Sequence, residues 1–293
     1  MTTSQSDMWS QWLLNRRFGG DPQYMKQMLD CLYPVRDKVL SHVQLGEGET
    51  LLDVGCGDGL IAFGALEIFP TCRVIFSDIS DDLLQHACAL GQAMNVQGRC
   101  RFVRASADDL SLFDDGSIDA VTTRSVLIYV SATQRAFDEF YRVLKPNGVI
   151  SIFEPINRFA YPEPPQRFCG YDVTPVVETA NKLKAVYTSL QPPDTDPMTD
   201  FDERDLLTCV GRAGFTRIGL ELQIEIKPPD RAGWEAFIRT AGNPKVPTIE
   251  EAMQQALTLE EMEAFIRYLR PLVEAGQGVN RSAMAYLWAR KLR

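Results

Sequence analysis

Short apolar runs alternate with helical patterns between residues 50 and 153. Strands are predicted at 50–54, 73–77, 101–104, 118–123 and 149–153, and helices at 60–69, 81–94 and 133–144. Brief apolar runs bounded by turn residues indicate buried strands, and strands that alternate with helices indicate a parallel sheet. The pattern therefore predicts an α/β fold with a doubly wound sheet.

Beyond residue 153 this alternation is interrupted twice. A stretch rich in proline and aromatic residues runs from 154 to 197 and contains a predicted helix at 174–190. A helix at 201–213 and a strand at 215–227 follow, and the chain ends with a strand at 282–290 whose alternation predicts a half-exposed position. We expect an N-terminal helical cap at 1–45 and one domain at 46–293, with insertions at about 155–198 and 228–280.

The second insertion carries a predicted helix at 234–240 and two helix-start signals. Thr248 with Glu251 and Thr258 with Glu261 have the spacing of capping boxes. Five apolar residues then recur at helical spacing and predict a packed face rather than a ligand site. They are Leu259, Met262, Phe265, Ile266 and Leu269.

Composition narrows the function classes. The formal net charge is −9, which argues against a nucleic-acid partner, because phosphate binding depends on clustered Lys and Arg. The seven Cys include no close pair of the kind that binds metal or performs redox chemistry, so we expect reduced thiols, no metal centre and a cytoplasmic location. No apolar stretch has the length of a signal peptide or a membrane span, so no membrane association is expected.

The most specific motif follows the first predicted strand. Residues 51–59 read LLDVGCGDG and lead directly into a helix. This resembles the first motif of class I S-adenosylmethionine-dependent methyltransferases, an acidic residue followed by G-x-G-x-G. The resemblance implies a seven-stranded mixed sheet with an antiparallel final strand, and S-adenosylmethionine held by Asp53, Gly55, Gly57 and Asp58. Glycines let such a loop turn sharply and approach a ligand closely.

Dinucleotide-binding proteins also use a glycine-rich turn between strand and helix. Their G-x-G-x-x-G pattern requires glycine where this chain has Leu60. Asp53 would repel a pyrophosphate but suits the amino group and the sulfonium of S-adenosylmethionine. A carboxylate that only caps the turn is the alternative for Asp53.

Further matches follow in the family order. Asp78 and Ile79 end the second strand, where a carboxylate can accept both ribose hydroxyls, although Asp78 could instead cap the next helix. Residues 104–110 resemble the segment that contacts the adenine, which implies roles for Ser106 or Asp108 and for the Ala107 N–H. Arg124 lies where the family approaches the methionine group, with a surface ion pair as the alternative.

Residues 142–148, RVLKPNG, match a family turn with Asn147 in place of glycine, a mild change because Asn tolerates the left-handed conformation. Tyr129 and Glu154 follow the fourth and fifth strands and are the candidate catalytic bases, each with a structural hydrogen-bonding role as the alternative. His42 and His86 fall within helical patterns and are not expected to act as bases.

Aromatic residues concentrate in the segments that lie outside the alternating core, as at Trp9, Trp12, Phe18, Tyr24, Tyr161, Phe168 and Tyr171. Together they suggest a lid over a small-molecule methyl acceptor. The resemblance implies a methyltransferase that acts on oxygen, nitrogen or carbon. An NAD-dependent oxidoreductase and a non-methylating protein that retains the fold are the alternatives.

Overall fold

The computed structural model describes residues 6–229 and 233–292, and its contacts divide the chain into two compact units. Unit 1 consists of Met1–Leu29, Asn157–Asp200 and Ile224–Ala283. Unit 2 consists of Asp30–Ile156, Phe201–Gln223 and Met284–Arg293. Each unit has its own buried apolar cluster, so each is described by itself.

The central feature of unit 2 is a seven-stranded sheet with the order β3-β2-β1-β4-β5-β9-β8. Its strands are β1 (Thr50–Val54), β2 (Arg73–Asp78), β3 (Cys100–Arg104), β4 (Ile118–Arg124), β5 (Leu144–Pro155), β8 (Thr216–Lys227) and β9 (Asn280–Arg290). The first five strands pair in parallel, and β9 runs antiparallel to β5. This arrangement confirms the predicted doubly wound mixed sheet.

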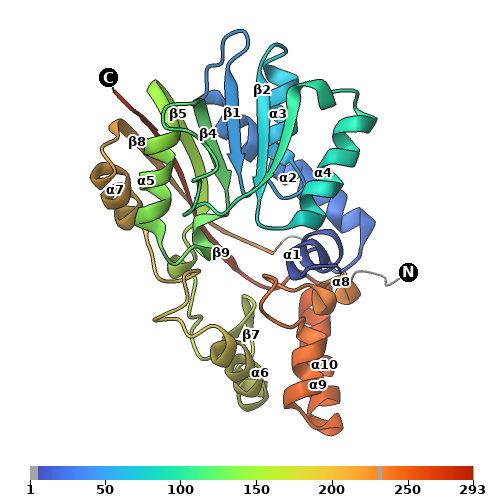
Figure 1. Ribbon diagram of the computed structural model, residues 1–293. Helices are drawn as coiled ribbons and strands as arrows, with labels where there is room; N and C mark the ends of the chain where they lie inside the picture. Colours follow the sequence, from blue (N-terminus) through green and yellow to red (C-terminus); the bar gives the residue numbers. More distant parts are fainter. Residues whose placement is uncertain (1–5, 230–232, 293) are drawn as a thin grey trace. The chain divides into compact units, whose positions relative to one another are not determined.

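Helices cover both faces of this sheet (Figure 1). One face is covered by α3 (Leu60–Ile68), α4 (Asp81–Ala93) and the part of α2 (Pro22–Ser41) that belongs to unit 2. Every second residue of a strand points to this face, and those residues, such as Leu51 of β1 and Phe76 of β2, form one buried cluster with the three helices. The other face is covered by α5 (Thr133–Val143) and α7 (Glu203–Arg212), and α5 contributes the fully buried Phe137 and Phe140.

The predicted alternation of the final strand is present, since residues 283, 285, 287 and 289 are buried and 282, 284, 288 and 290 are only partly buried, with the buried Tyr286 as the exception. β9 lies between β5 and β8, so Ala285, Leu287 and Ala289 are buried and β8 is the edge strand.

Unit 1 is mostly helical. It contains α1 (Met8–Gln11), η1 (Trp12–Arg16), η4 (Asn157–Phe159), η5 (Thr174–Val176), α6 (Val177–Leu190), α8 (Trp234–Arg239), α9 (Ile249–Ala256), α10 (Leu259–Glu274) and a hairpin of β6 (Arg167–Phe168) and β7 (Tyr171–Asp172). Short 3₁₀ helices in unit 2 are η2 (Gln97–Arg99) and η3 (Leu127–Tyr129). Within residues 6–229 and 233–292, every helix is too short or too polar to cross a lipid bilayer.

Both predicted capping boxes form in unit 1. Thr248 and Glu251 at the start of α9, and the equivalent pair at the start of α10, exchange hydrogen bonds with each other's backbone N–H. Phe265 and Leu269 of α10 are fully buried, as predicted. Leu259 is 76% exposed, so its predicted packing was wrong, because the first helical residue after the cap points away from the buried face.

Candidate active site

The turn between β1 and α3 depends on glycine. Gly55, Gly57 and Gly59 have φ values of 65°, 55° and 87°, in the region that side chains with a Cβ disfavour. A Cβ on Gly55 would lie 2.4 Å from Val126 Cγ2. The glycine motif is therefore required by the backbone path and by the close approach of the loop after β4.

Asp78, at the end of β2, fixes this turn from the neighbouring strand. Its Oδ2 accepts a hydrogen bond from the Gly57 N–H at 2.9 Å, and its Oδ1 accepts one from the Ser80 N–H at 3.0 Å. The cap of α4 is Ser80, whose Oγ accepts from the Leu83 N–H at 3.0 Å. Asp78 therefore holds its carboxylate at the carboxyl edge of the sheet, beside the glycine turn.

Asp53 lies one residue before the end of β1 and is 2% exposed. Its Oδ1 accepts a hydrogen bond from the Thr122 hydroxyl at 2.8 Å. Burial raises the pKa of Asp53 to about 7, against the lowering effects of the Thr122 hydrogen bond and the charge of Arg124. A cation placed beside Asp53 would favour its ionised form.

Buried acceptor atoms without a partner gather around the turn. Within the described part of the chain they include Asp53 Oδ2, Asp58 Oδ1 and the Ser77 hydroxyl. Buried polar atoms are rarely left unsatisfied, so these oxygens can accept hydrogen bonds from a ligand or from an ordered water. Asp53 and Asp58 were expected here from the sequence. Ser77 and Thr122 were not expected here. Both lie at or near the carboxyl ends of their strands, so the pairing of those strands with β1 would have indicated their positions.

Residues after β2 and β3 lie along the same edge of the sheet. Asp78 pairs with Arg104 in the β2–β3 register, so Ser106 and Ala107 follow β3 close to Asp78. The Ser106 hydroxyl donates to the Asp108 carboxylate, which joins the two candidates for the adenine contact. Ile79 exposes 44% of its side chain at this edge, and Ala107 is buried.

Glu154 is fully buried near the end of β5. Its Oε1 accepts hydrogen bonds from the N–H groups of Val126 at 2.9 Å and Leu127 at 3.0 Å, and its Oε2 accepts from Ile128 N–H at 3.3 Å. Burial raises its pKa to about 7, and these three N–H donors oppose the rise. Glu154 thus holds the turn at η3 that carries Tyr129, a partly buried residue.

The remaining candidates are placed as follows. Arg124 ends β4, close enough to Asp53 to lower the pKa of its carboxyl group. His42 stacks on Trp288 with ring centroids 3.9 Å apart, and His86 lies within α4, so neither lies at the glycine turn. Residues 6–229 and 233–292 contain no group of three His, Cys, Asp or Glu able to hold a metal ion.

Comparisons with known proteins identify a methyltransferase domain in this chain. Residues 52–152 match the family model of a methyltransferase domain. The chain is 37% identical over 131 residues to a demethylmenaquinone methyltransferase of Clavibacter sepedonicus, which covers 43% of this chain and 47% of that protein. The chain spans about half the length, or less, of the first curated relatives it matches.

Two solved structures share the fold at low sequence identity. A geranyl diphosphate methyltransferase in complex with SAM superposes with a TM-score of 0.53 at 17% identity, over 94% of each chain. A [4+2]-cyclase, SpnF, superposes with a TM-score of 0.50 at 20% identity, over 89% of this chain and 80% of that chain. The same fold therefore occurs in proteins whose names describe different reactions.

Proposed function

We propose that this chain, a class I methyltransferase by its sheet and by the methyltransferase domain at residues 52–152, transfers a methyl group from S-adenosylmethionine to a small organic molecule. The proposal rests on the glycine turn and its acidic neighbours. The fold and the domain match indicate the family, and the proposal adds the reaction and its cofactor.

One observation supports this cofactor above others. Asp53 Oδ2 and Asp58 Oδ1 are buried acceptors without a partner in the described residues, on either side of the glycine turn. The amino group and sulfonium of S-adenosylmethionine would supply donors and positive charge to these oxygens. A pyrophosphate would place negative charge beside two carboxylates, which disfavours a nicotinamide dinucleotide.

The other binding roles follow the edge of the sheet. Asp78 is proposed to accept the ribose hydroxyls, because its carboxylate lies at the carboxyl end of β2. Ile79, Ser106 and Ala107 are proposed to surround the adenine. Arg124 is proposed to approach the methionine carboxylate, next to Asp53.

Methyl transfer from a sulfonium depends mainly on how the protein positions the two reacting molecules. The sulfonium supplies an activated methyl group, so transfer depends on holding an acceptor atom close and aligned. A base is needed only when the acceptor atom must lose a proton. Tyr129 is the proposed candidate for that role. Glu154 stays a predicted base, and its three N–H donors favour a positioning role for it at the turn before Tyr129.

The acceptor is proposed to be a small molecule. The names of the demethylmenaquinone and geranyl diphosphate methyltransferases describe organic acceptors, and both proteins share this domain or fold. The segments at 1–45, 155–198 and 228–280 are proposed to act as a cap. The cytoplasm is proposed as the location, on the spacing of the cysteines alone.

A non-methylating role is the second candidate, because a neighbour of the same fold is named a cyclase. Calorimetry with S-adenosylmethionine, S-adenosylhomocysteine and NAD, followed by incubation with a radiolabelled methyl donor and a panel of phenols, amines and quinols, separates the possibilities. We expect saturable binding of both adenosyl compounds, no binding of NAD, and label in an organic product. Tight NAD binding in their place would refute the proposal, whereas cofactor binding without transfer to any acceptor would favour the second candidate.

A further inference from the structure

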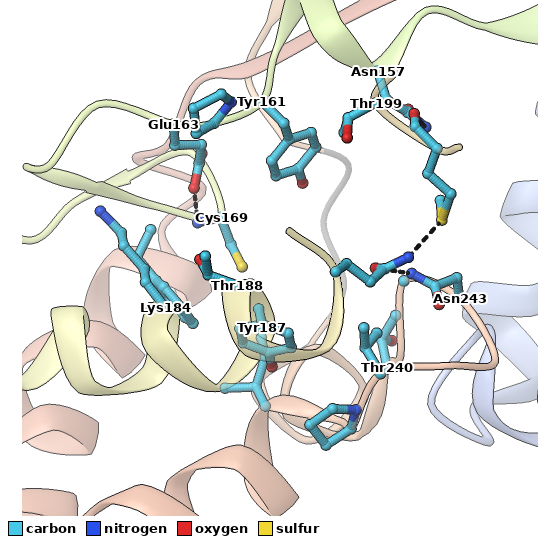
Figure 2. Close-up of a pocket in the computed structure, with 18 of the residues that line it drawn as sticks. Asn157, Tyr161, Glu163, Cys169, Lys184, Tyr187, Thr188, Thr199, Thr240 and Asn243 are labelled. Atoms are coloured by element: carbon cyan, nitrogen blue, oxygen red, sulfur yellow. Dashed lines mark hydrogen bonds between the residues drawn. The ribbon is translucent and has the colours of Figure 1, made fainter. Parts of the chain in front are cut away.

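Unit 1 contains a cavity of about 560 Å³ that is lined by residues of that unit alone. Its walls come from the segment after η4, the β6–β7 hairpin, the end of α6, the loop at 191–199 and the segment at 240–249 (Figure 2). Cavities of 300 to 1,000 Å³ are typical of small-molecule sites. Its size makes this cavity a candidate binding site, and none of its lining residues belongs to the glycine turn.

Aromatic residues contribute much of the apolar wall of the cavity. Six aromatic side chains from different segments line the cavity, namely Tyr24, Tyr161, Phe168, Tyr171, Tyr187 and Phe237. Phe168 and Tyr171 also belong to the buried cluster of unit 1, so the cavity borders the core. Aromatic faces contribute a large apolar area at low entropic cost and stack on flat rings. The walls therefore favour a flat, apolar body.

The charged groups at the wall are already engaged by backbone. Glu163 accepts hydrogen bonds from the N–H groups of Cys169 at 2.8 Å and Gly170 at 2.7 Å. Lys184 Nζ donates to the carbonyl oxygens of Pro164 and Pro165, and its ammonium points away from the open middle of the cavity in Figure 2.

The third charged group of the wall, Asp196, accepts a hydrogen bond from the Met198 N–H at 2.9 Å. The Gln191 amide also donates to this carboxylate, at 3.3 Å. A charged ligand would lose part of its hydration against the apolar walls, and an anion would also meet the carboxylates of Glu163 and Asp196.

Neutral polar groups do face the cavity. The hydroxyl of Tyr161 and the thiol of Cys169 point into its open middle (Figure 2). Tyr161 is 52% exposed and Cys169 is also exposed, so both groups are open to solvent as well as to the cavity. Within residues 6–229 and 233–292, no hydrogen-bond partner is found for the Tyr161 hydroxyl. That hydroxyl can therefore donate to, or accept from, an oxygen on a bound molecule.

We propose that unit 1 binds a neutral, flat molecule of fused rings that carries at least one carbonyl or hydroxyl oxygen, with that oxygen hydrogen-bonded to Tyr161. The aromatic walls take the ring system, and the carboxylates of Glu163 and Asp196 disfavour an anion. The inference goes beyond methyl transfer, because it concerns binding in unit 1 and does not require the bound molecule to be the acceptor.

The test uses two fluorescent probes of similar size on the full chain. Nile red is neutral, has fused rings and carries a ring carbonyl, whereas 8-anilinonaphthalene-1-sulfonate is an anion. We expect Nile red to bind at one molecule per chain and the sulfonate to bind at least ten times more weakly. Equal affinity for the two probes, or no saturable binding of Nile red, would overturn the proposal.

Substitutions then locate the probe. Thr188→Trp places a large side chain at an exposed α6 position that lines the cavity, and we expect it to weaken Nile red binding at least ten-fold. Ser189→Trp is the matched control, since Ser189 is the next residue on the same helix and does not line the cavity. Equal binding by the two variants would contradict the assigned site. The affinity for S-adenosylmethionine, measured in parallel, should be the same in the two variants. This second measurement tests the proposed function independently of Nile red binding.

Tyr161→Phe tests the hydrogen bond. Loss of one neutral hydrogen bond is expected to weaken Nile red binding about five-fold and to shift its emission to the blue. Tyr33→Phe is the control, because it makes the same chemical change at an exposed position in α2 that does not line the cavity. An unchanged affinity and emission for Tyr161→Phe would refute the role given to this hydroxyl.

Discussion

The carboxylate of Asp78 accepts a hydrogen bond from the backbone N–H of Gly57, with 2.9 Å between Oδ2 and the nitrogen. This bond connects the end of β2 to the glycine turn after β1. The residue proposed to bind the ribose thus also holds the turn proposed to bind the methionine end. Changes at Asp78 should therefore affect both ends of the cofactor.

Asp78→Ala is expected to weaken S-adenosylmethionine binding by about 1.5 to 3 kcal/mol, since a hydrogen bond to a charged group contributes about this much free energy. Isothermal titration calorimetry measures the change. Asp81→Ala is a matched control, because Asp81 starts the next helix and forms an exposed ion pair with Arg104. Equal affinities of the wild type and Asp78→Ala would remove Asp78 from the site.

Cofactor affinity should depend on pH through Asp53. In the free protein the pKa of Asp53 is raised to about 7 by burial, and a bound cation would lower it. S-adenosylmethionine therefore binds the ionised form more tightly, so affinity should rise as pH increases towards 7 and level off above it. Binding below pH 7 should also release protons, which calorimetry in buffers of different ionisation enthalpy detects.

Asp53→Asn should bind the cofactor more weakly at pH 8 and should lose most of this pH dependence. Glu154 also has a pKa raised to about 7, so Glu154→Gln is the necessary control and should keep the dependence. A wild-type affinity that stays constant from pH 5.5 to 8 would contradict the role of Asp53.

Glu154→Gln is expected to lower the free energy of unfolding by about 1 to 3 kcal/mol at pH 5. The substitution replaces one of the two accepting oxygens by an NH2 group, which would then face a backbone N–H donor. The raised pKa of Glu154 stabilises the wild type fully below pH 4.5, and this contribution is lost as pH rises through 7. The difference between the two proteins should therefore shrink from pH 5 to pH 8, as measured by urea denaturation.

Kinetics of the same variant separate its two proposed roles. A base at Glu154 predicts a fall in turnover with little change in cofactor affinity. A positioning role predicts that turnover and stability fall together. Full activity in Glu154→Gln would exclude both roles.

Asn147 offers a test of the turn between α5 and the main part of β5. Its φ is +68°, which Asn and Gly adopt more readily than other residues. Asn147→Gly is expected to change stability by only a few tenths of a kcal/mol, and Asn147→Ala to cost about 1 kcal/mol. Thermal unfolding of the three proteins checks this, and an alanine variant as stable as the wild type would contradict the expected cost of a Cβ at this position.

The sequence predicted the elements of the sheet closely, because the helix and strand periods are local properties of the chain. The predicted strand at 50–54 matches β1, and the predicted helix at 60–69 ends within one residue of α3. The glycine motif and both capping boxes could also be read directly, since each depends on residues within a few positions of one another.

Pairings between distant segments could not be predicted in this way. Thr122 donates to Asp53 across 69 positions of sequence, and the three N–H donors of Glu154 come from a turn about 27 positions earlier. Nothing in the local pattern shows which buried oxygens are satisfied by such contacts and which are left without a partner.

By itself, the sequence determined where strands and helices form, where the chain must turn through glycine, and which carboxylates follow the strands, because these follow from local periodicity and backbone sterics. The tertiary structure alone decided that β9 lies inside the sheet, that Glu154 is occupied by backbone donors, and that aromatic residues of unit 1 enclose a cavity. Those outcomes depend on burial and on contacts between residues far apart in the chain, which the order of residues does not specify locally.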